Sequence, residues 1–247
     1  MSTHNWLAFD TSTYVLSLGV ARGERVWTQT LPGGAQASSG LIPAVLAMLA
    51  EAGLALTQLD AVVFGRGPGS FTGLRTACAV AQGLAFGADI AVLPVDTLLA
   101  VAEEARFQQL QGGAPERDLT VLALLDARMD EVYSAAYRWA SAAQHWHAVS
   151  PLQVCAPEQL RTGTALDLLA GNVFGVYGER LALEGERRVS LPTASALLRL
   201  APVLWAQGLA VPADQAMPLY IRDKVANTTA EREAIKAEAA AKAAVHS

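Results

Sequence analysis

A glycine-dense segment from Gly65 to Arg75 has the composition of an anion-binding turn. Its sequence, GRGPGSFTGLR, places four glycines and one proline between two apolar stretches. Glycine has no Cβ, so such a turn lets the backbone approach a ligand closely, and the free N–H groups of a following helix favour an anion. Neither a Walker Gly-Lys-Ser/Thr nor a Rossmann Gly-x-Gly-x-x-Gly is present. A phosphate-binding turn and a purely structural turn therefore both stay open.

Side chains suited to nucleophilic or metal chemistry are few. Ser70 lies among the glycines, but GSFTG is not the Gly-x-Ser-x-Gly of a nucleophile elbow. Cys78 falls on a helix of small residues, where core packing is the expected role. His145 and His147 share one face of an expected strand in a polar region, so we interpret them as solvated rather than as metal ligands.

Composition limits the possible classes of protein. The 247 residues suffice for one large or two small domains, and 52% of them are hydrophobic. No run approaches the roughly 20 apolar residues of a membrane span, and no secretory signal is visible. Two cysteines cannot form a disulfide scaffold, so we expect a cytoplasmic protein. The net charge of −5 and the absence of clustered Lys and Arg indicate that any nucleic acid is held mainly by partners.

Hydrophobic periodicity predicts two similar α/β units. The first opens with a meander of three strands (residues 6–10, 15–21 and 25–30), followed by helices over 38–53, 72–88 and 97–109 and strands over 61–64 and 90–94. Ser38 or Ser39 is the expected N-cap of the helix over 38–53, and Gly53 is its expected C-terminal stop. A polar segment at 111–118 marks a boundary. The second unit has strands over 119–126, 131–139, 146–155 and 166–171, and a late helix around 197–205.

The helix over residues 72–88 carries unusually small side chains. It is rich in alanine and glycine, and two glycines inside a helix cost roughly 1 kcal/mol each relative to alanine. Close approach of another helix is a reason to keep them. We hypothesise that this helix and the helix over residues 38–53 together contact a partner, through Leu41, Val45, Leu49, Arg75, Ala79 and Gly83.

Five motifs in register carry a family resemblance. They are LAFDTS at residues 7–12, the glycine-dense segment, AQGLAFG at 81–87, LDARMDEVY at 125–133 and PLYIR at 218–222. Together they resemble the bacterial TsaB family, also called YeaZ, from about Trp6 to Arg222. The resemblance implies an actin-like, hexokinase-like ATPase fold (ASKHA, ribonuclease H-like) of two lobes, each a mixed sheet with flanking helices.

The resemblance also implies how the chain is divided. Residues 1–110 would form a ribonuclease H-like lobe that docks on a partner, and residues 118–192 a smaller second lobe. Residues 193–222 would form a C-terminal helix and segment that pack back on the lobes. The resemblance ends at about Arg222, and by composition residues 223–247 are expected to be an alanine-rich tail, helical or disordered.

The function implied is that of a non-catalytic subunit in the synthesis of N6-threonylcarbamoyladenosine in tRNA. Such a subunit stabilises a catalytic paralogue, TsaD, which carries the metal; the ATPase TsaE joins them, and tRNA is bound only through the complex. We expect a homodimer when the chain is alone. We expect no metal, no catalytic residue and no cofactor required by this subunit, with ATP or ADP at the complex interface.

ATPases of this fold place a carboxylate at the end of the first strand near nucleotide-bound Mg²⁺. Asp10 occupies that place here and is followed by hydroxyls, although hydrogen bonding within its own turn is the expected role. Asp126 begins the corresponding turn of the second unit. The residues expected near a phosphate are Asp10, Thr11, Ser12, Gly67, Gly69, Ser70 and Thr72.

Two enzymatic alternatives remain. A glycoprotease-like peptidase acting on TsaD would need a metal pair or an activated nucleophile, and the sequence shows neither. A small-molecule kinase of the same fold would need insertions for its substrate, for which two minimal lobes leave little room.

Overall fold

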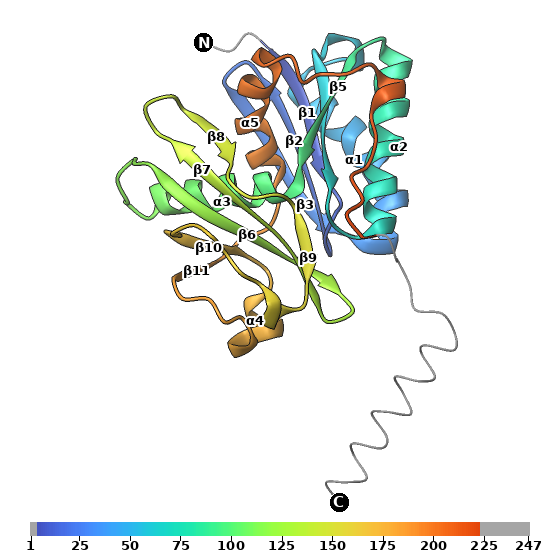
Figure 1. Cartoon of the computed structure of the whole chain (residues 1–247). Coiled ribbons are helices and arrows are strands. Elements are labelled where there is room, and N and C mark those ends of the chain that lie inside the picture. Colours follow the sequence, from blue (N-terminus) through green and yellow to red (C-terminus); the bar gives the residue numbers. More distant parts are fainter. Residues whose placement is uncertain (1–3, 223–247) are drawn as a thin grey trace, which may run out of the picture.

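A computed structural model describes residues 4–222, except for the side chain of residue 35, and shows two lobes (Figure 1). The first lobe holds β1 (Asn5–Asp10), β2 (Val15–Arg22), β3 (Arg25–Pro32), β4 (Ala61–Gly67) and β5 (Ala91–Asp96). The second holds β6 (Leu119–Arg128), β7 (Glu131–Ala140), β8 (His145–Ala148), β9 (Gln153–Cys155), β10 (Leu168–Gly171) and β11 (Glu186–Val189). The expected tail, residues 223–247, lies outside the described residues.

Each lobe is built on a mixed sheet, and the two sheets repeat one topology. The first has the strand order β3-β2-β1-β4-β5, and the second has β8-β7-β6-β10-β11, with β9 pairing additionally with β7. In both, the first hairpin pairs antiparallel. The next strand, β4 or β10, pairs parallel to the first strand, and the last strand, β5 or β11, pairs parallel to that one. The expectation of two lobes, each a mixed sheet with flanking helices, is confirmed.

Helices cover both faces of the first sheet. Side chains alternate between the faces of a strand, so Leu7 and Phe9 face α1 (Ala37–Ala52) and α2 (Phe71–Ala88). Trp6 and Ala8 face α5 (Ala194–Ala206). The helix α3 (Thr97–Gln111) follows β5 and packs between the lobes, against β4, β6 and α5. The short α4 (Phe174–Tyr177) covers the second sheet.

Two local expectations are wrong. The strand expected over 146–155 is broken into β8 and β9, because Pro151 has no N–H to donate and both pieces pair separately with β7. A serine cap was expected for the helix over 38–53. The helix instead continues from a 3₁₀ turn at Gly34–Gln36, and its N-cap is Gln36 without a side-chain bond. Its C-terminal stop at Gly53, with φ of 65°, agrees with the sequence.

Candidate functional site

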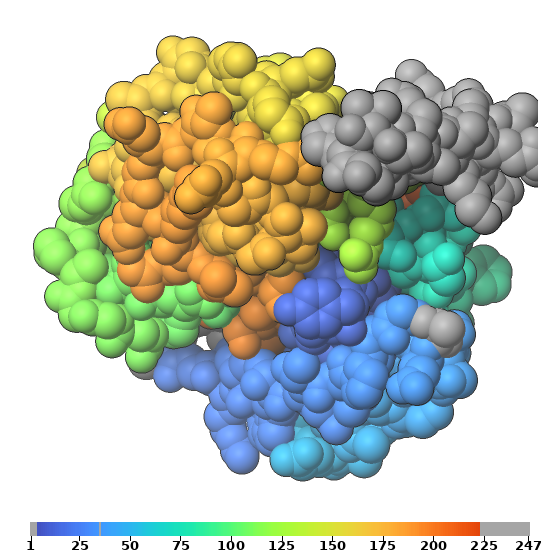
Figure 2. All heavy atoms as spheres, turned by 90° about the horizontal axis from the view of Figure 1, so that it is seen from below, coloured from blue at the N-terminus to red at the C-terminus, as the bar shows by residue number. Residues whose placement is uncertain are grey.

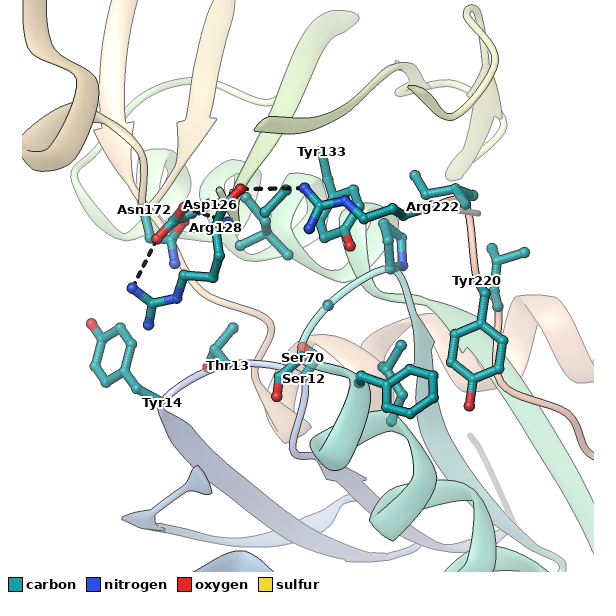
Figure 3. Close-up of a pocket in the computed structure, with 18 of the residues that line it drawn as sticks. Ser12, Thr13, Tyr14, Ser70, Asp126, Arg128, Tyr133, Asn172, Tyr220 and Arg222 are labelled. Carbon is teal, nitrogen blue, oxygen red and sulfur yellow. Dashed lines mark hydrogen bonds and ion pairs between the residues drawn. The ribbon is translucent and has the colours of Figure 1, made fainter. Parts of the chain in front are cut away.

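A cleft of about 380 Å³ opens where the two lobes meet (Figures 2 and 3). The first lobe contributes the β1–β2 turn and the β4–α2 turn, and the second contributes the β6–β7 turn. A C-terminal segment, residues 216–222, which we call the strap, completes the wall with residues 219–222. The polar and aromatic residues lining the cleft are Ser12, Thr13, Tyr14, Ser70, Phe71, Asp126, Arg128, Tyr133, Asn172, Tyr220 and Arg222.

The glycines of the β4–α2 turn let it pack directly on the β1–β2 turn. A Cβ at Gly73 would lie 1.9 Å from the backbone oxygen of Thr11, and a Cβ at Gly69 would lie 2.6 Å from the Cβ of Ser12. Ser70 N donates to the Ser12 oxygen at 2.8 Å, and Thr11 Oγ1 donates to the Gly73 oxygen at 2.7 Å. The glycines therefore serve close contact between two turns, which in turn positions the start of α2.

Asp10 lies beneath this contact rather than in the cleft. It is fully buried, and its Oδ1 accepts hydrogen bonds from the backbone N and the hydroxyl of Ser12, at 2.8 and 2.6 Å. Gly65 leaves room for the carboxylate, because a Cβ there would lie 1.8 Å from Oδ2. The carboxylate thus bonds mainly its own turn, and its Oδ2 also accepts from the hydroxyl of Thr97 at 3.5 Å. Burial raises its pKa to about 6, while the Ser12 hydrogen bonds oppose that shift.

The raised pKa of Asp10 predicts an unusual pH dependence of stability. The folded chain holds this proton up to about pH 6, whereas the unfolded chain releases it near pH 3.8, so stability falls as pH rises between these values. A shift of this size corresponds to about 3 kcal/mol. Relative to wild type, Asp10→Asn should therefore gain about 3 kcal/mol in free energy of unfolding between pH 4 and pH 7, measured by urea denaturation.

Asp214→Asn, at an exposed aspartate, controls for the loss of one negative charge. A stability difference between Asp10→Asn and wild type that stays constant from pH 4 to pH 8 would contradict the assignment.

The β6–β7 turn presents an arginine to the cleft from a strained backbone. Arg128, Met129 and Asp130 all have positive φ, between 53° and 64°, which is costly for residues other than glycine. Asp126 stabilises the turn, because its Oδ1 accepts from Arg128 N and from the hydroxyl of Tyr177, both at 2.8 Å. The Arg128 side chain is 79% exposed and lies 3.2 Å from Asp126 Oδ2. In Figure 3 it extends toward Tyr14 across the cleft.

The strap ties α2 to the second lobe across the mouth of the cleft. Gln82 Nε2 donates to the Ala216 oxygen at 2.8 Å, and Leu219 N donates to the Arg66 oxygen at 2.7 Å. At its end, Arg222 forms an ion pair with Glu131 and donates to the Arg128 oxygen at 3.2 Å. The PLYIR motif is therefore a structural connection between the lobes.

The cleft is suited to binding an anion rather than to holding Mg²⁺. Hydroxyls of Ser12 and Ser70 and the guanidinium of Arg128 line it, but no lysine or histidine does among the described residues. Asp10 is sealed away, and Asp126 is bonded to Arg128 and Tyr177. Within residues 4–222, no three His, Cys, Asp or Glu side chains gather as metal ligands would.

Only part of the expected phosphate site reaches the cleft. Ser12, Gly69 and Ser70 line it, but Asp10, Thr11 and Gly67 are buried behind it, and Thr72 is exposed on the first turn of α2 without lining it. Sequence reasoning missed the cleft residues Tyr14, Arg128, Asn172 and Arg222. Arg128 is the last residue of β6 and Asn172 directly follows β10, so polar residues at the ends of these strands are the signal that could have found them.

Of the six residues expected to contact a partner, three are exposed and three are buried. Arg75, Ala79 and Gly83 lie on the exposed side of α2, whereas Leu41, Val45 and Leu49 are buried against the first sheet. The assignment of these three residues to a docking surface is corrected: they face the core of their own lobe. The outward side of α1 carries Ile42 and Leu46 instead, one residue further along.

The outward sides of α1 and α2 are exposed and mostly apolar or small, and we call them together the docking face: Ile42, Pro43, Leu46, Ala47, Arg75, Ala79, Gly83 and Phe86. The two helices contact each other side by side (Figure 1). Ile42 is 44% exposed, Leu46 56% and Phe86 82%.

Among the described residues, no helix has both the length and the apolar character needed to cross a bilayer.

The remaining candidates for chemistry lie apart from the cleft. Cys78 is buried and donates to the Ala216 oxygen at 3.3 Å, and burial raises its pKa, which makes it a poor nucleophile. The rings of His145 and His147 lie 4.0 Å apart on β8, and His145 lines a different pocket, between α3, α5 and β7–β8.

Comparisons with known proteins decide the family. The chain is 36% identical to the tRNA threonylcarbamoyladenosine biosynthesis protein TsaB of Haemophilus influenzae, over 89% of this chain and 94% of that protein. It is 34% identical to the TsaB protein of Escherichia coli, over 89% of this chain and 95% of that one. This chain belongs to the TsaB family. Over residues 33–244 it also matches the family model for TsaD, described as tRNA N6-adenosine threonylcarbamoyltransferase.

Solved structures of the TsaB family agree with the fold. YeaZ from Pseudomonas aeruginosa superposes with a TM-score of 0.79 at 36% identity, covering 88% of this chain and all of that one. A second structure, described as similar to the peptidase YeaZ from Pseudomonas aeruginosa, has the same TM-score at 37% identity and covers 89% of this chain. The resemblance to the TsaB family stated from the five motifs is confirmed.

Proposed function

We propose that this chain is a non-catalytic subunit of the machinery that makes N6-threonylcarbamoyladenosine in tRNA, and that it binds and stabilises a TsaD protein through the docking face. The observation that supports this proposal most directly is the open space around Gly83. A Cβ at Gly83 would meet nothing within 4 Å, and the same is true of Gly87. Packing within the chain therefore gives no reason for these glycines, which weaken an isolated helix. A partner helix that approaches closely would give such a reason.

The composition of the docking face supports this proposal. Phe86, Ile42 and Leu46 are all exposed on it, so these large apolar side chains would otherwise stay in water. The alanines between them keep the surface flat enough for helices to meet. Since a C2 interface uses the same surface twice, the face also suits a homodimer when the chain is alone.

The cleft supports a binding role rather than a catalytic one. A serine nucleophile needs a base within hydrogen-bond reach, and no histidine among the described residues lines the cleft beside Ser70. The buried carboxylate of Asp10 is occupied by Ser12. We assign no cofactor to this chain. ATP or ADP would bind where the partner meets the first turn of α2, and tRNA and TsaE would join through the assembled cytoplasmic complex.

The peptidase alternative is tested by incubating the purified chain with TsaD. We expect TsaD to stay intact; cleavage that disappears in Ser70→Ala or Cys78→Ala would overturn the non-catalytic assignment.

The kinase alternative is tested by ATP consumption in the presence of sugar or acetate acceptors, where we expect no acceptor-dependent turnover by the isolated chain.

Overpacking the docking face tests where TsaD binds. Ala79 is exposed in the part of the docking face that α2 contributes. Ala79→Trp should therefore leave the fold intact while preventing close contact with a partner helix. We expect at least 100-fold weaker association with TsaD by isothermal titration calorimetry. Ala142→Trp, at an exposed alanine in the β7–β8 turn, is the matched control. Unchanged affinity of Ala79→Trp would place the contact elsewhere.

A further inference from the structure

Arg75 is held in one orientation at the edge of the docking face. Its guanidinium lies 3.8 Å from the centroid of the Phe71 ring, and its Nε donates to the hydroxyl of Tyr220 at 3.2 Å. The Phe71 and Tyr220 rings are themselves 5.1 Å apart. A stacked ring and a hydrogen bond to Nε together restrict a side chain that is otherwise highly mobile.

This arrangement leaves the outer edge of the guanidinium available. Arg75 is exposed on the outward side of α2. Among the described residues, neither its Nη1 nor its Nη2 has a hydrogen-bond or ion-pair partner. The paired N–H groups of a guanidinium match the two oxygens of a carboxylate. Arg75 is therefore preorganised for an anion that this chain does not supply.

Arg75 is also the only basic residue of α1 and α2. The rest of the docking face is apolar or small, so a partner that covers it removes water from the guanidinium as well. Burying an arginine without a counter-charge is unfavourable enough to cancel much of the gain from burying Phe86 and Leu46.

We propose that Arg75 is the specificity-determining residue of the docking face, and that it binds a carboxylate of an Asp or Glu side chain on the partner subunit. This inference rests on the proposed function. The apolar residues supply area, whereas the arginine fixes the register of the partner helix, because a shifted partner would leave both charges unpaired.

Isothermal titration of the full chain against TsaD tests the pairing. We expect Arg75→Glu to weaken association at least 100-fold. Arg75→Lys should weaken it about 10-fold, because it keeps the charge but loses the paired donors. Arg25→Glu is the matched control, since Arg25 is also exposed and stacked on an aromatic ring, at 4.8 Å from Trp27, but lies on β3. Its affinity should match wild type, and all variants should melt at the wild-type temperature.

Leu46→Asp separates the failure of the pairing from the failure of the docking face. If Leu46→Asp abolishes association but Arg75→Glu changes it less than threefold, the carboxylate pairing is wrong and the face stands. If neither changes the affinity, both proposals are wrong. Each titration is repeated with and without ATP: an effect of Arg75→Glu that appears only with ATP would show that a nucleotide phosphate, and not a partner carboxylate, occupies the site.

Discussion

Replacing Gly73 by alanine is expected to destabilise the chain by about 3 kcal/mol, whereas the same replacement at Gly83 should stabilise it by about 1 kcal/mol. Both glycines lie in α2, and alanine is the better helix former at each by roughly 1 kcal/mol. The surroundings reverse the sign at Gly73. Its new Cβ would lie 1.9 Å from the backbone oxygen of Thr11, so the turn and the helix must separate.

Separation at Gly73 also breaks specific hydrogen bonds. The Thr11 hydroxyl loses the Gly73 oxygen, and the Ser70 N–H moves away from Ser12, each of which leaves buried polar groups unsatisfied. At Gly83 the new Cβ meets nothing within 4 Å. For a protein of this size, the melting temperature should fall by about 10 °C at Gly73 and rise by about 3 °C at Gly83.

Thermal unfolding followed by circular dichroism measures both variants under identical conditions. Equal and small effects at the two positions would mean that the turn is more loosely packed than described. Destabilisation at Gly83 would mean that the glycine has a role within the isolated chain, which removes the main argument for a partner helix.

Replacing Phe86 by aspartate is expected to weaken association with TsaD at least 100-fold while leaving the melting temperature within about 2 °C of wild type. Phe86 is 82% exposed, so the fold does not depend on it. A phenylalanine buried at an interface contributes roughly 150 Å² of surface, or about 4 kcal/mol, and an aspartate there would add an unpaired charge. Each 1.4 kcal/mol corresponds to about tenfold in affinity.

Val176→Asp is the matched control for Phe86→Asp. Val176 is a 60% exposed apolar residue on α4 of the second lobe, far in sequence from the docking face. We expect it to associate with TsaD as wild type does. A loss of affinity for Val176→Asp equal to that for Phe86→Asp would show that surface hydrophobicity in general, and not this face, drives association.

The fold could be predicted from the sequence to a large extent, because strand alternation and glycine stops act locally. The direction in which α1 presents its side chains could not. Leu41 and Val45 form one apolar stripe and Ile42 and Leu46 another, so the helix is apolar on two sides and its periodicity does not say which side meets the sheet. Only the position of the sheet decides this.

The candidate site was harder to predict because it is assembled from distant segments. Asp10 has the right residue type at the end of β1, but Gly65, which lets it turn inward, lies on another strand. The strap residues Tyr220 and Arg222 meet Arg75 and Glu131, which lie 145 and 91 residues away along the chain. The late polar strand β11, with the sequence ERRV, carries no apolar alternation and was missed.

The central claim, that this chain supplies a surface and not a reacting group, is tested most directly by one measurement. It is the rate of N6-threonylcarbamoyladenosine formation by the reconstituted machinery as a function of the concentration of this chain. Phe86→Asp should need at least 100-fold more protein to reach the wild-type plateau, because it weakens binding alone. The double variant Asp10→Asn/Ser70→Ala should reach the same plateau at the wild-type concentration. A plateau that falls 100-fold or more in that double variant, with its fold intact, would contradict the account.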